Sequence, residues 1–160
     1  MDIVVVGSGP AGSAVAVGLR KLGYRVQVLA TRRGFSSIEG ISERTLQALR
    51  DLGLNRAASS VGGAVQRITS WDESSRQTNS EFLLDRERFD AALREDLASY
   101  DIELIDVRVA ELDLRSGVSR LHSDEGQLFE AGFVVDARGR AAHQRGNAAI
   151  KGPATLSLSR

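Results

Sequence analysis

The chain has 160 residues, of which 42% are hydrophobic and 26% charged, a composition typical of one soluble globular domain with a buried core. Its 21 basic residues balance 21 acidic ones, so no nucleic-acid partner is expected. Because the chain has no cysteine, neither a disulfide framework nor a cysteine zinc site is expected. No apolar stretch approaches the roughly 20 residues that span a bilayer, and no basic leader precedes the first apolar run. The sequence therefore predicts a cytoplasmic protein with no membrane partner and no metal.

The first 30 residues carry the most informative pattern. A β-branched run over residues 2–6 is typical of a buried parallel strand, and Gly7–Gly12 then fits G-x-G-x-x-G. Ser13–Leu22 predicts a helix that ends at Gly23, and Tyr24–Ala30 predicts a second strand. The glycines thus lie inside a βαβ unit of about 30 residues, which is the context of a dinucleotide-binding loop.

Each glycine of this motif has its own expected role. Gly7 permits the turn out of the strand, Gly9 lets a pyrophosphate approach the backbone, and Gly12 lets the helix pack closely on the sheet. The N–H groups of the first helical turn then face the phosphates. The alternative is a glycine-rich turn that binds nothing, which the flanking strand and helix disfavour.

One residue of the dinucleotide pattern is missing. An acidic side chain is expected at the end of the second strand to bind ribose hydroxyls, but Ala30 stands there, followed by Thr31, Arg32 and Arg33. The two arginines suit the 2′-phosphate of NADP, or they lie along the adenosine of another dinucleotide. The pattern alone leaves NADP and FAD open.

The middle of the chain predicts helices and short strands. Ser42 is a good N-cap for a helix that ends at Gly53, with a loop after it. The following segments predict a strand, a turn, a second strand and a helix, in the order Val65–Trp71, Ser74–Ser80, Glu81–Leu84 and Asp85–Ser99.

Strand periodicity dominates after Ile102. Four segments predict hairpins: Ile102–Ile105, Val107–Leu114, Val118–His122 and Gln127–Glu130. The apolar run Phe133–Val135 predicts a parallel strand that returns to the sheet and places Asp136 and Gly139 at its carboxyl edge, where open α/β sheets bind ligands. The predicted fold class is α/β, a Rossmann-like parallel sheet with β-hairpin insertions.

Four motifs in this order closely resemble the FAD-binding part of flavin-dependent monooxygenases. They are Gly7–Gly12, Gly40-Ile41-Ser42-Glu43-Arg44, Asp85-Arg86 and Asp136-Ala137-Arg138-Gly139-Arg140. Related enzymes include the para-hydroxybenzoate hydroxylase-like enzymes, the geranylgeranyl reductases and the tryptophan halogenases. The resemblance covers residues 2–145 and implies FAD as the cofactor and NAD(P)H as the electron donor.

The resemblance also implies which residues contact FAD. The pyrophosphate would lie against the glycine loop, and the adenosine along an arginine after the second strand and a backbone group of a later strand. An arginine at the start of the helix after Ser42 would reach the flavin side, and an arginine in the helix that Asp85 starts would approach the cofactor. An aspartate would bind the ribityl chain or the pyrophosphate, and a glycine would leave clearance. In chain order these residues are Gly7, Gly9, Pro10, Ala11, Gly12, Arg32, Arg44, Arg86, Val109, Asp136 and Gly139. No catalytic residue is assigned.

The implied activity is the hydroxylation of an aromatic substrate through a flavin C4a-hydroperoxide. The segment Glu39–Arg44 resembles that of flavoproteins that modify tryptophan during the maturation of quinoprotein amine dehydrogenases, which makes a peptidyl tryptophan a candidate substrate. The resembling halogenases rely on a lysine in the segment after their equivalent of the Gly40 motif, and no lysine lies here between Lys21 and Lys151, so the resemblance disfavours halogenation. The competing hypothesis is a module that binds NADP or FAD without chemistry of its own, or that needs a partner chain.

The resembling enzymes are much longer than this chain. We therefore expect an incomplete two-domain flavoprotein: residues 1–145 bind FAD, residues 62–84 contribute to the substrate side, and residues 146–160 begin a C-terminal continuation. Such a chain would be inactive alone and would associate with itself or with the missing segment.

Overall fold

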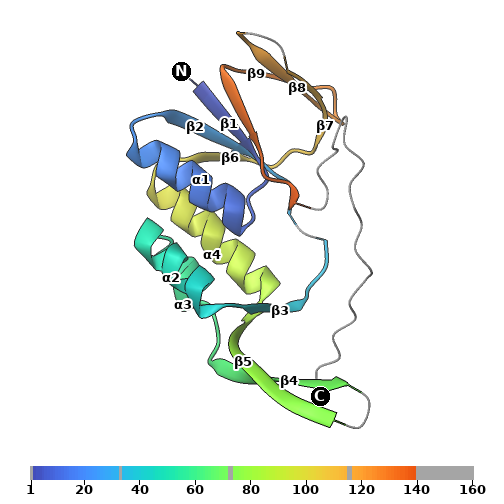
Figure 1. Ribbon diagram of the computed structural model, residues 1–160. Coiled ribbons are helices and arrows are strands. Elements are labelled where there is room, and N and C mark those ends of the chain that lie inside the picture. Colours follow the sequence, from blue (N-terminus) through green and yellow to red (C-terminus); the bar gives the residue numbers. More distant parts are fainter. Residues whose placement is uncertain (1, 33, 72–73, 115–116, 140–160) are drawn as a thin grey trace.

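A four-stranded parallel sheet forms the centre of the protein (Figure 1). The computed structural model describes residues 2–32, 34–71, 74–114 and 117–139. The sheet has the order β10-β1-β2-β6, and its strands are β1 (Asp2–Val6), β2 (Arg25–Leu29), β6 (Glu103–Ile105) and β10 (Phe133–Asp136). All neighbouring pairs run parallel, with Ile3 opposite both Val26 and Phe133. The predicted α/β fold and the parallel return of β10 are confirmed.

Helices cover one face of this sheet. The helices are α1 (Pro10–Lys21), α2 (Glu43–Leu52), α3 (Asn55–Ser59) and α4 (Arg86–Ser99). The longest two, α1 and α4, lie nearest the strands, and α2 and α3 pack outside them (Figure 1). The core between the layers contains Val5, Val28, Phe89, Leu93 and Leu97, all with fully buried side chains. No helix in the described ranges is long and apolar enough to cross a membrane.

A three-stranded antiparallel sheet covers the opposite face. Its strands follow one another as β7 (Val109–Asp113), β8 (Ser119–Ser123) and β9 (Leu128–Ala131). A second core of buried residues joins it to the parallel sheet, with Val4, Val6 and Leu29 on one side and Val109 and Leu121 on the other. The molecule is thus a sheet between a helical layer and a β layer.

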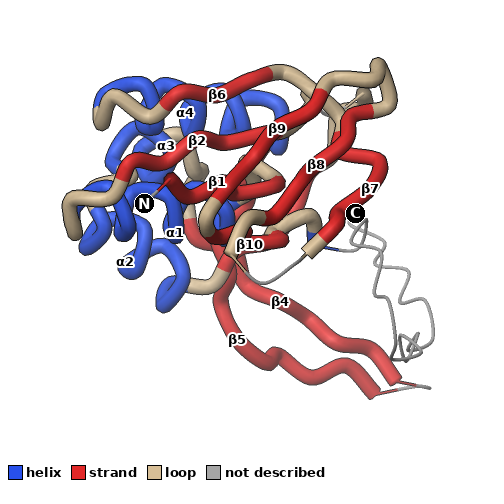
Figure 2. Tube along the Cα trace, turned by 90° about the horizontal axis from the view of Figure 1, so that it is seen from above, coloured by secondary structure: helices blue, strands red, loops and turns tan. Residues whose placement is uncertain are grey.

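A separate ribbon extends away from this body. It has the antiparallel order β3-β5-β4, formed by β3 (Ile38–Ile41), β4 (Ala64–Trp71) and β5 (Ser74–Asp85). Ile41 and Leu84 anchor its base in the helical core, while the far end of β4 and β5 projects from the molecule (Figure 2). The strand predicted at Val65–Trp71 is confirmed.

The turn predicted at Ser74–Ser80 is wrong. These residues form the first half of β5, in which Ser74 pairs with Trp71 and Ser80 with Gln66. Serine and asparagine favour turns locally, but the backbone hydrogen bonds of a long ladder outweigh that preference. The connection between the two strands falls at residues 72–73, outside the described residues.

The hairpin predicted from Ile102–Ile105 is also wrong. Glu103–Ile105 pairs in parallel with β2, because α4 carries the chain back across the sheet before it. The strands after it do form the predicted hairpins, as β7, β8 and β9. A three-residue apolar segment does not reveal its partner, so its sequence could not distinguish the two pairings.

The loop expected after Gly53 contains the short helix α3. The carboxylate of Asp96, from α4, accepts hydrogen bonds from the N–H groups of Arg56 and Ala57 at 3.2 and 2.9 Å. An acid about 40 residues away in sequence thus caps the helix. By contrast, the local caps of α2 are as predicted: Ser42 Oγ accepts from the N–H of Thr45, and Gly53 adopts φ 86°.

An Asp96→Ala variant should be less stable than the wild type by about 2 kcal/mol. Asp96 is only 1% exposed, and its removal leaves two N–H groups of α3 without an acceptor. Urea denaturation measures the loss. Glu95→Ala is the matched control, because that exposed carboxylate lies 3.8 Å from Arg56 and should contribute little. Equal losses in the two variants would contradict the capping role.

Candidate functional site

A cleft of about 1270 Å³ opens at the carboxyl ends of the parallel strands. From β1 the chain continues to β2 on one side, whereas β10 lies on the other side of β1. The cleft lies at this change of direction, which is the usual ligand position in open α/β sheets. Its walls come from distant parts of the chain: residues 6–11, 29–32, 34–36, 107–109 and 137–139, and one face of α4.

Two glycines of the first motif are required by the protein itself. Gly7 has φ 107°, and a Cβ there would lie 2.7 Å from the carbonyl oxygen of Ala137. A Cβ at Gly12 would lie 1.9 Å from the carbonyl oxygen of Gly7. Neither position accepts a side chain without a backbone shift, so both glycines fix the crossing of β1, α1 and the end of β10.

The glycine between them has no such internal cause. Gly9 has φ −69°, which any residue adopts, and a Cβ built there has no atom of the described residues within 4 Å. Gly9 lines the cleft. Neither backbone geometry nor packing requires a glycine at this position of the cleft wall. A ligand group that approaches the backbone closely, as a pyrophosphate does, would require one.

The start of α1 adds hydrogen-bond donors to this wall. The first helical bond runs from the N–H of Ser13 to the carbonyl of Gly9, so the N–H groups of Ala11 and Gly12 have no acceptor within the helix. Pro10 occupies the first helical position, and no acidic side chain lies in the first turn. The partial positive charge at this helix end therefore favours an anion in the cleft.

Arg86 lies on the opposite wall with its side chain almost fully buried. Its Nη2 donates to Asp90 Oδ1 at 2.7 Å, and its Nη1 lies 3.6 Å from Glu39 Oε2. The guanidinium carbon lies 5.6 Å from the centre of the Phe89 ring. Its Nε is a buried donor with no hydrogen-bond partner among the described residues. A buried donor without a partner in the protein is suited to donate a hydrogen bond to a ligand.

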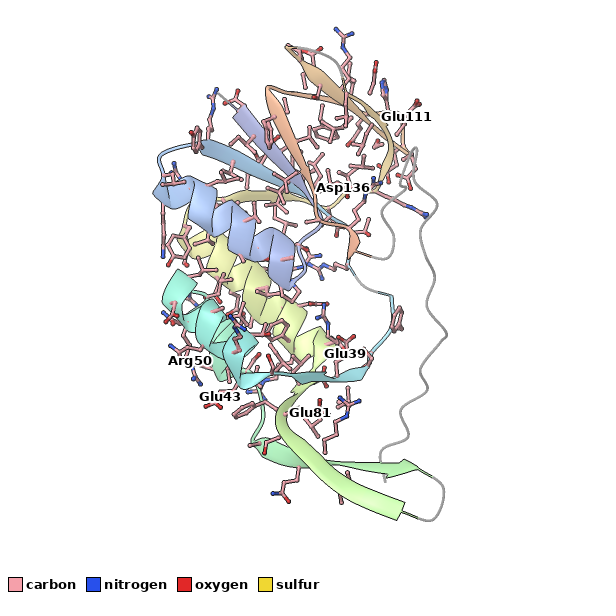
Figure 3. The ribbon with its side chains drawn as sticks, in the orientation of Figure 1. Glu39, Glu43, Arg50, Glu81, Glu111 and Asp136 are labelled. Atoms are coloured by element: carbon pink, nitrogen blue, oxygen red, sulfur yellow. The ribbon has the colours of Figure 1, made fainter. Side chains whose placement is uncertain are left out.

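An arginine that the motif analysis did not single out as a ligand lies at the end of β10. Arg138 donates from Nε and Nη2 to the carboxylate of Asp136 at 2.9 and 2.7 Å, and from Nη1 to the carbonyl of Val109 at 3.2 Å. The hydrogen bond to Asp136 raises the pKa of Arg138 above its ordinary value. Arg138 thus ties the parallel sheet to β7 and lines the cleft, whereas Asp136, labelled in Figure 3, is not among the lining residues.

The structure brings most of the predicted site residues together. Those that line the cleft are Gly7, Gly9, Pro10, Ala11, Arg32, Arg86, Val109 and Gly139. Gly12 supports the loop from within α1, and Arg44 is an exposed residue of α2 that does not line the cleft. The sequence did not indicate Phe35, Arg94 and Arg108, since no local motif marks them, and Arg138 lies in the last motif without having been assigned a contact.

Comparisons with known proteins agree with this geometry. The model of the family described as lycopene cyclase protein matches residues 2–156. The structure of QhpG, described as a peptidyl tryptophan dihydroxylase essential for tryptophylquinone cofactor biogenesis, has a TM-score of 0.78 and 43% identity, covering 89% of this chain and 33% of QhpG. This chain therefore spans about a third of QhpG's length.

More distant structures share the fold alone. A flavoprotein/dehydrogenase from Cytophaga hutchinsonii has a TM-score of 0.67 and 21% identity, over 86% of this chain and 39% of its own. The oxygenase of 2-methyl-3-hydroxypyridine-5-carboxylic acid has a TM-score of 0.66 and 19% identity, over 83% of this chain and 38% of its own.

Proposed function

The chain belongs to the lycopene cyclase protein family of FAD-binding flavoproteins, and on this premise we propose that its cleft binds FAD. The observation that carries the proposal is Gly9, whose open position no internal contact explains. The pyrophosphate would lie against this glycine and accept hydrogen bonds from the N–H groups of Ala11 and Gly12. Arg86 Nε would supply a donor from the other wall.

The proposed activity of the whole protein is FAD-dependent monooxygenation of an aromatic substrate, with NAD(P)H as electron donor. When bound and reduced, FAD supplies the activation of dioxygen. The described residues of this chain would bind the cofactor and orient it. Residues 1–145 would form the FAD-binding domain, with residues 62–84, which include β4 and most of β5, on the substrate side. A cytoplasmic location stays a prediction from the sequence.

The proposed substrate is a peptidyl tryptophan. The support is the 43% identity with QhpG over 89% of this chain, together with QhpG's description as a peptidyl tryptophan dihydroxylase. The resemblance of Glu39–Arg44 to tryptophan-modifying flavoproteins also supports a peptidyl tryptophan as the substrate.

An oxygen electrode and size-exclusion chromatography test how much of this activity the chain carries. We expect the 160-residue chain to show no NAD(P)H-dependent oxygen consumption with a tryptophan-containing peptide and to associate with itself. Self-association is expected because β4 is an edge strand of its sheet, and such edges recruit further strands. A monomer that consumes oxygen and hydroxylates the peptide would contradict this expectation.

A second candidate is an NADP-binding module, which the replacement of the ribose-binding acid favours. Ala30 lines the cleft, and its N–H donates to the carbonyl of Ile105 at 3.1 Å. Arg32 lies on the same wall with an 80% exposed side chain, 3.7 Å from Asp106. An exposed guanidinium suits a phosphate on the ribose.

An Ala30→Glu variant separates the two candidates. For an FAD site, the new carboxylate restores the ribose acceptor, so the affinity for FAD should be unchanged or improved by up to about 1 kcal/mol. Isothermal titration with FAD and with NADPH measures both affinities. A joint loss of FAD and NADPH affinity would favour the NADP site, because the carboxylate would then repel a ribose phosphate.

A further inference from the structure

Among the described residues, some of the arginines around the cleft lie beside carboxylates, and others do not. The arginines that line it are Arg32, Arg86, Arg94, Arg108 and Arg138. Three of them lie within 4 Å of a carboxylate: Arg32 of Asp106 at 3.7 Å, Arg86 of Asp90 at 2.7 Å, and Arg138 of Asp136 at 2.7 Å. With Glu39 beside Arg86, and with Glu87 in the lining, these carboxylates already match the arginines in number. A dianionic ligand therefore needs the cations that are not held by an acid.

Arg94 is the better placed of the two remaining cations. Arg94 is half-buried, whereas Arg108 is exposed, and neither forms an ion pair with another residue in the described part of the chain. A partly buried guanidinium has lost some of its water, and a nearby anion offsets that cost better than it does for a fully solvated one.

The position of Arg94 on α4 directs it toward the ligand. Arg86, Asp90 and Arg94 recur at intervals of four residues, which places them on one face of the helix, and all three line the cleft. Eight residues of helix span about 12 Å, so Arg94 meets a different part of an extended dinucleotide from Arg86.

We propose that Arg94 binds the diphosphate of the dinucleotide in this cleft, at a point separate from the hydrogen bond that Arg86 Nε would donate. This inference rests on the proposed FAD site and adds the residue that supplies uncompensated positive charge to it. Arg32 and Arg138 each lie beside a carboxylate, that of Asp106 and that of Asp136, so a neighbouring acid already compensates their charge.

The test compares two arginines of the same helix. Arg88 is exposed on α4 and does not line the cleft, so Arg88→Met removes a charge at a distance from the ligand. Titration calorimetry with FAD, ADP and riboflavin is applied to wild type, Arg88→Met, Arg94→Met and Arg94→Lys. Thermal melting shows that each variant is folded, and Arg94→Lys retains the charge should the methionine variant fail to fold.

Arg94→Met should weaken FAD and ADP binding about tenfold, while riboflavin, which has no phosphate, binds as before. Arg94→Lys should retain most of the affinity and lose only the geometry of the guanidinium. Arg88→Met should bind all three ligands as the wild type does. The affinity of Arg94→Met for FAD should also depend less steeply on salt concentration.

Two results would overturn the inference in distinguishable ways. If Arg94→Met binds FAD and ADP as Arg88→Met does, or loses riboflavin equally, Arg94 does not bind the diphosphate although the cleft is an FAD site. If the folded wild type binds neither FAD nor ADP, the proposed function fails, and this inference fails with it.

Discussion

A Gly9→Asp variant is expected to fold with wild-type stability and to lose FAD binding altogether. In the described part of the chain no atom lies within 4 Å of a Cβ at Gly9, so the substitution strains neither the loop nor its described neighbours. The new side chain would enter the path proposed for the pyrophosphate, and its negative charge would repel the phosphates at the start of α1. Fluorescence titration with FAD measures the binding, and urea denaturation measures the stability.

Gly63→Asp is the matched control for this variant. Gly63 is exposed in the loop before β4, and a Cβ there also has no protein atom within 4 Å. The same charge is thus added in open space outside the cleft, and FAD affinity should not change. If Gly9→Asp bound FAD as tightly as Gly63→Asp does, the assignment of the glycine loop to the pyrophosphate would be wrong.

A Gly12→Ala variant, unlike Gly9→Asp, should be much less stable than the wild type. Its Cβ would lie 1.9 Å from the carbonyl oxygen of Gly7 and 3.3 Å from the Cβ of Ala137. Because these are backbone and short side-chain atoms, α1 must move away from the sheet. We expect the free energy of unfolding to fall by about 3 kcal/mol, as measured by urea denaturation.

Gly18→Ala controls for helix propensity in the same element. A Cβ at Gly18, near the end of α1, meets no atom within 4 Å, and alanine is the better helix former by up to about 1 kcal/mol. That variant should be as stable as the wild type or more stable. Similar stabilities for Gly12→Ala and Gly18→Ala would show that α1 has room to shift, contrary to the close crossing described above.

The parts of the fold that could be predicted from the sequence depend on local signals. The glycine motif lies directly between a buried strand and a helix, and Ser42 and Gly53 cap α2 through their own backbone neighbourhood. The return of Phe133–Asp136 beside β1 follows from its continuous apolar run. In the glycine motif and in α2 the pattern and the structure concern residues only a few positions apart, whereas β10 could be predicted because a continuous apolar run marks a buried parallel strand even though its partner β1 is distant in sequence.

The parts that could not be predicted depend on distant partners. The serine-rich start of β5 becomes a strand because β4 pairs with it, and α3 begins where Asp96 of α4 supplies an acceptor. The candidate site has the same limit. Arg94 and Arg138 line the cleft because α4 and β10 converge there, and the motif containing Arg44 does not reveal that its arginine lies outside the lining.

The cleft is expected to bind FAD in preference to NADP(H). Titrating the purified 160-residue chain with FAD and with NADPH, and following flavin absorbance and binding heat, tests it most directly. We expect saturable FAD binding at one site per chain, with NADPH bound far more weakly. Preferential binding of NADPH by a colourless protein would contradict it and would favour the NADP-binding module instead.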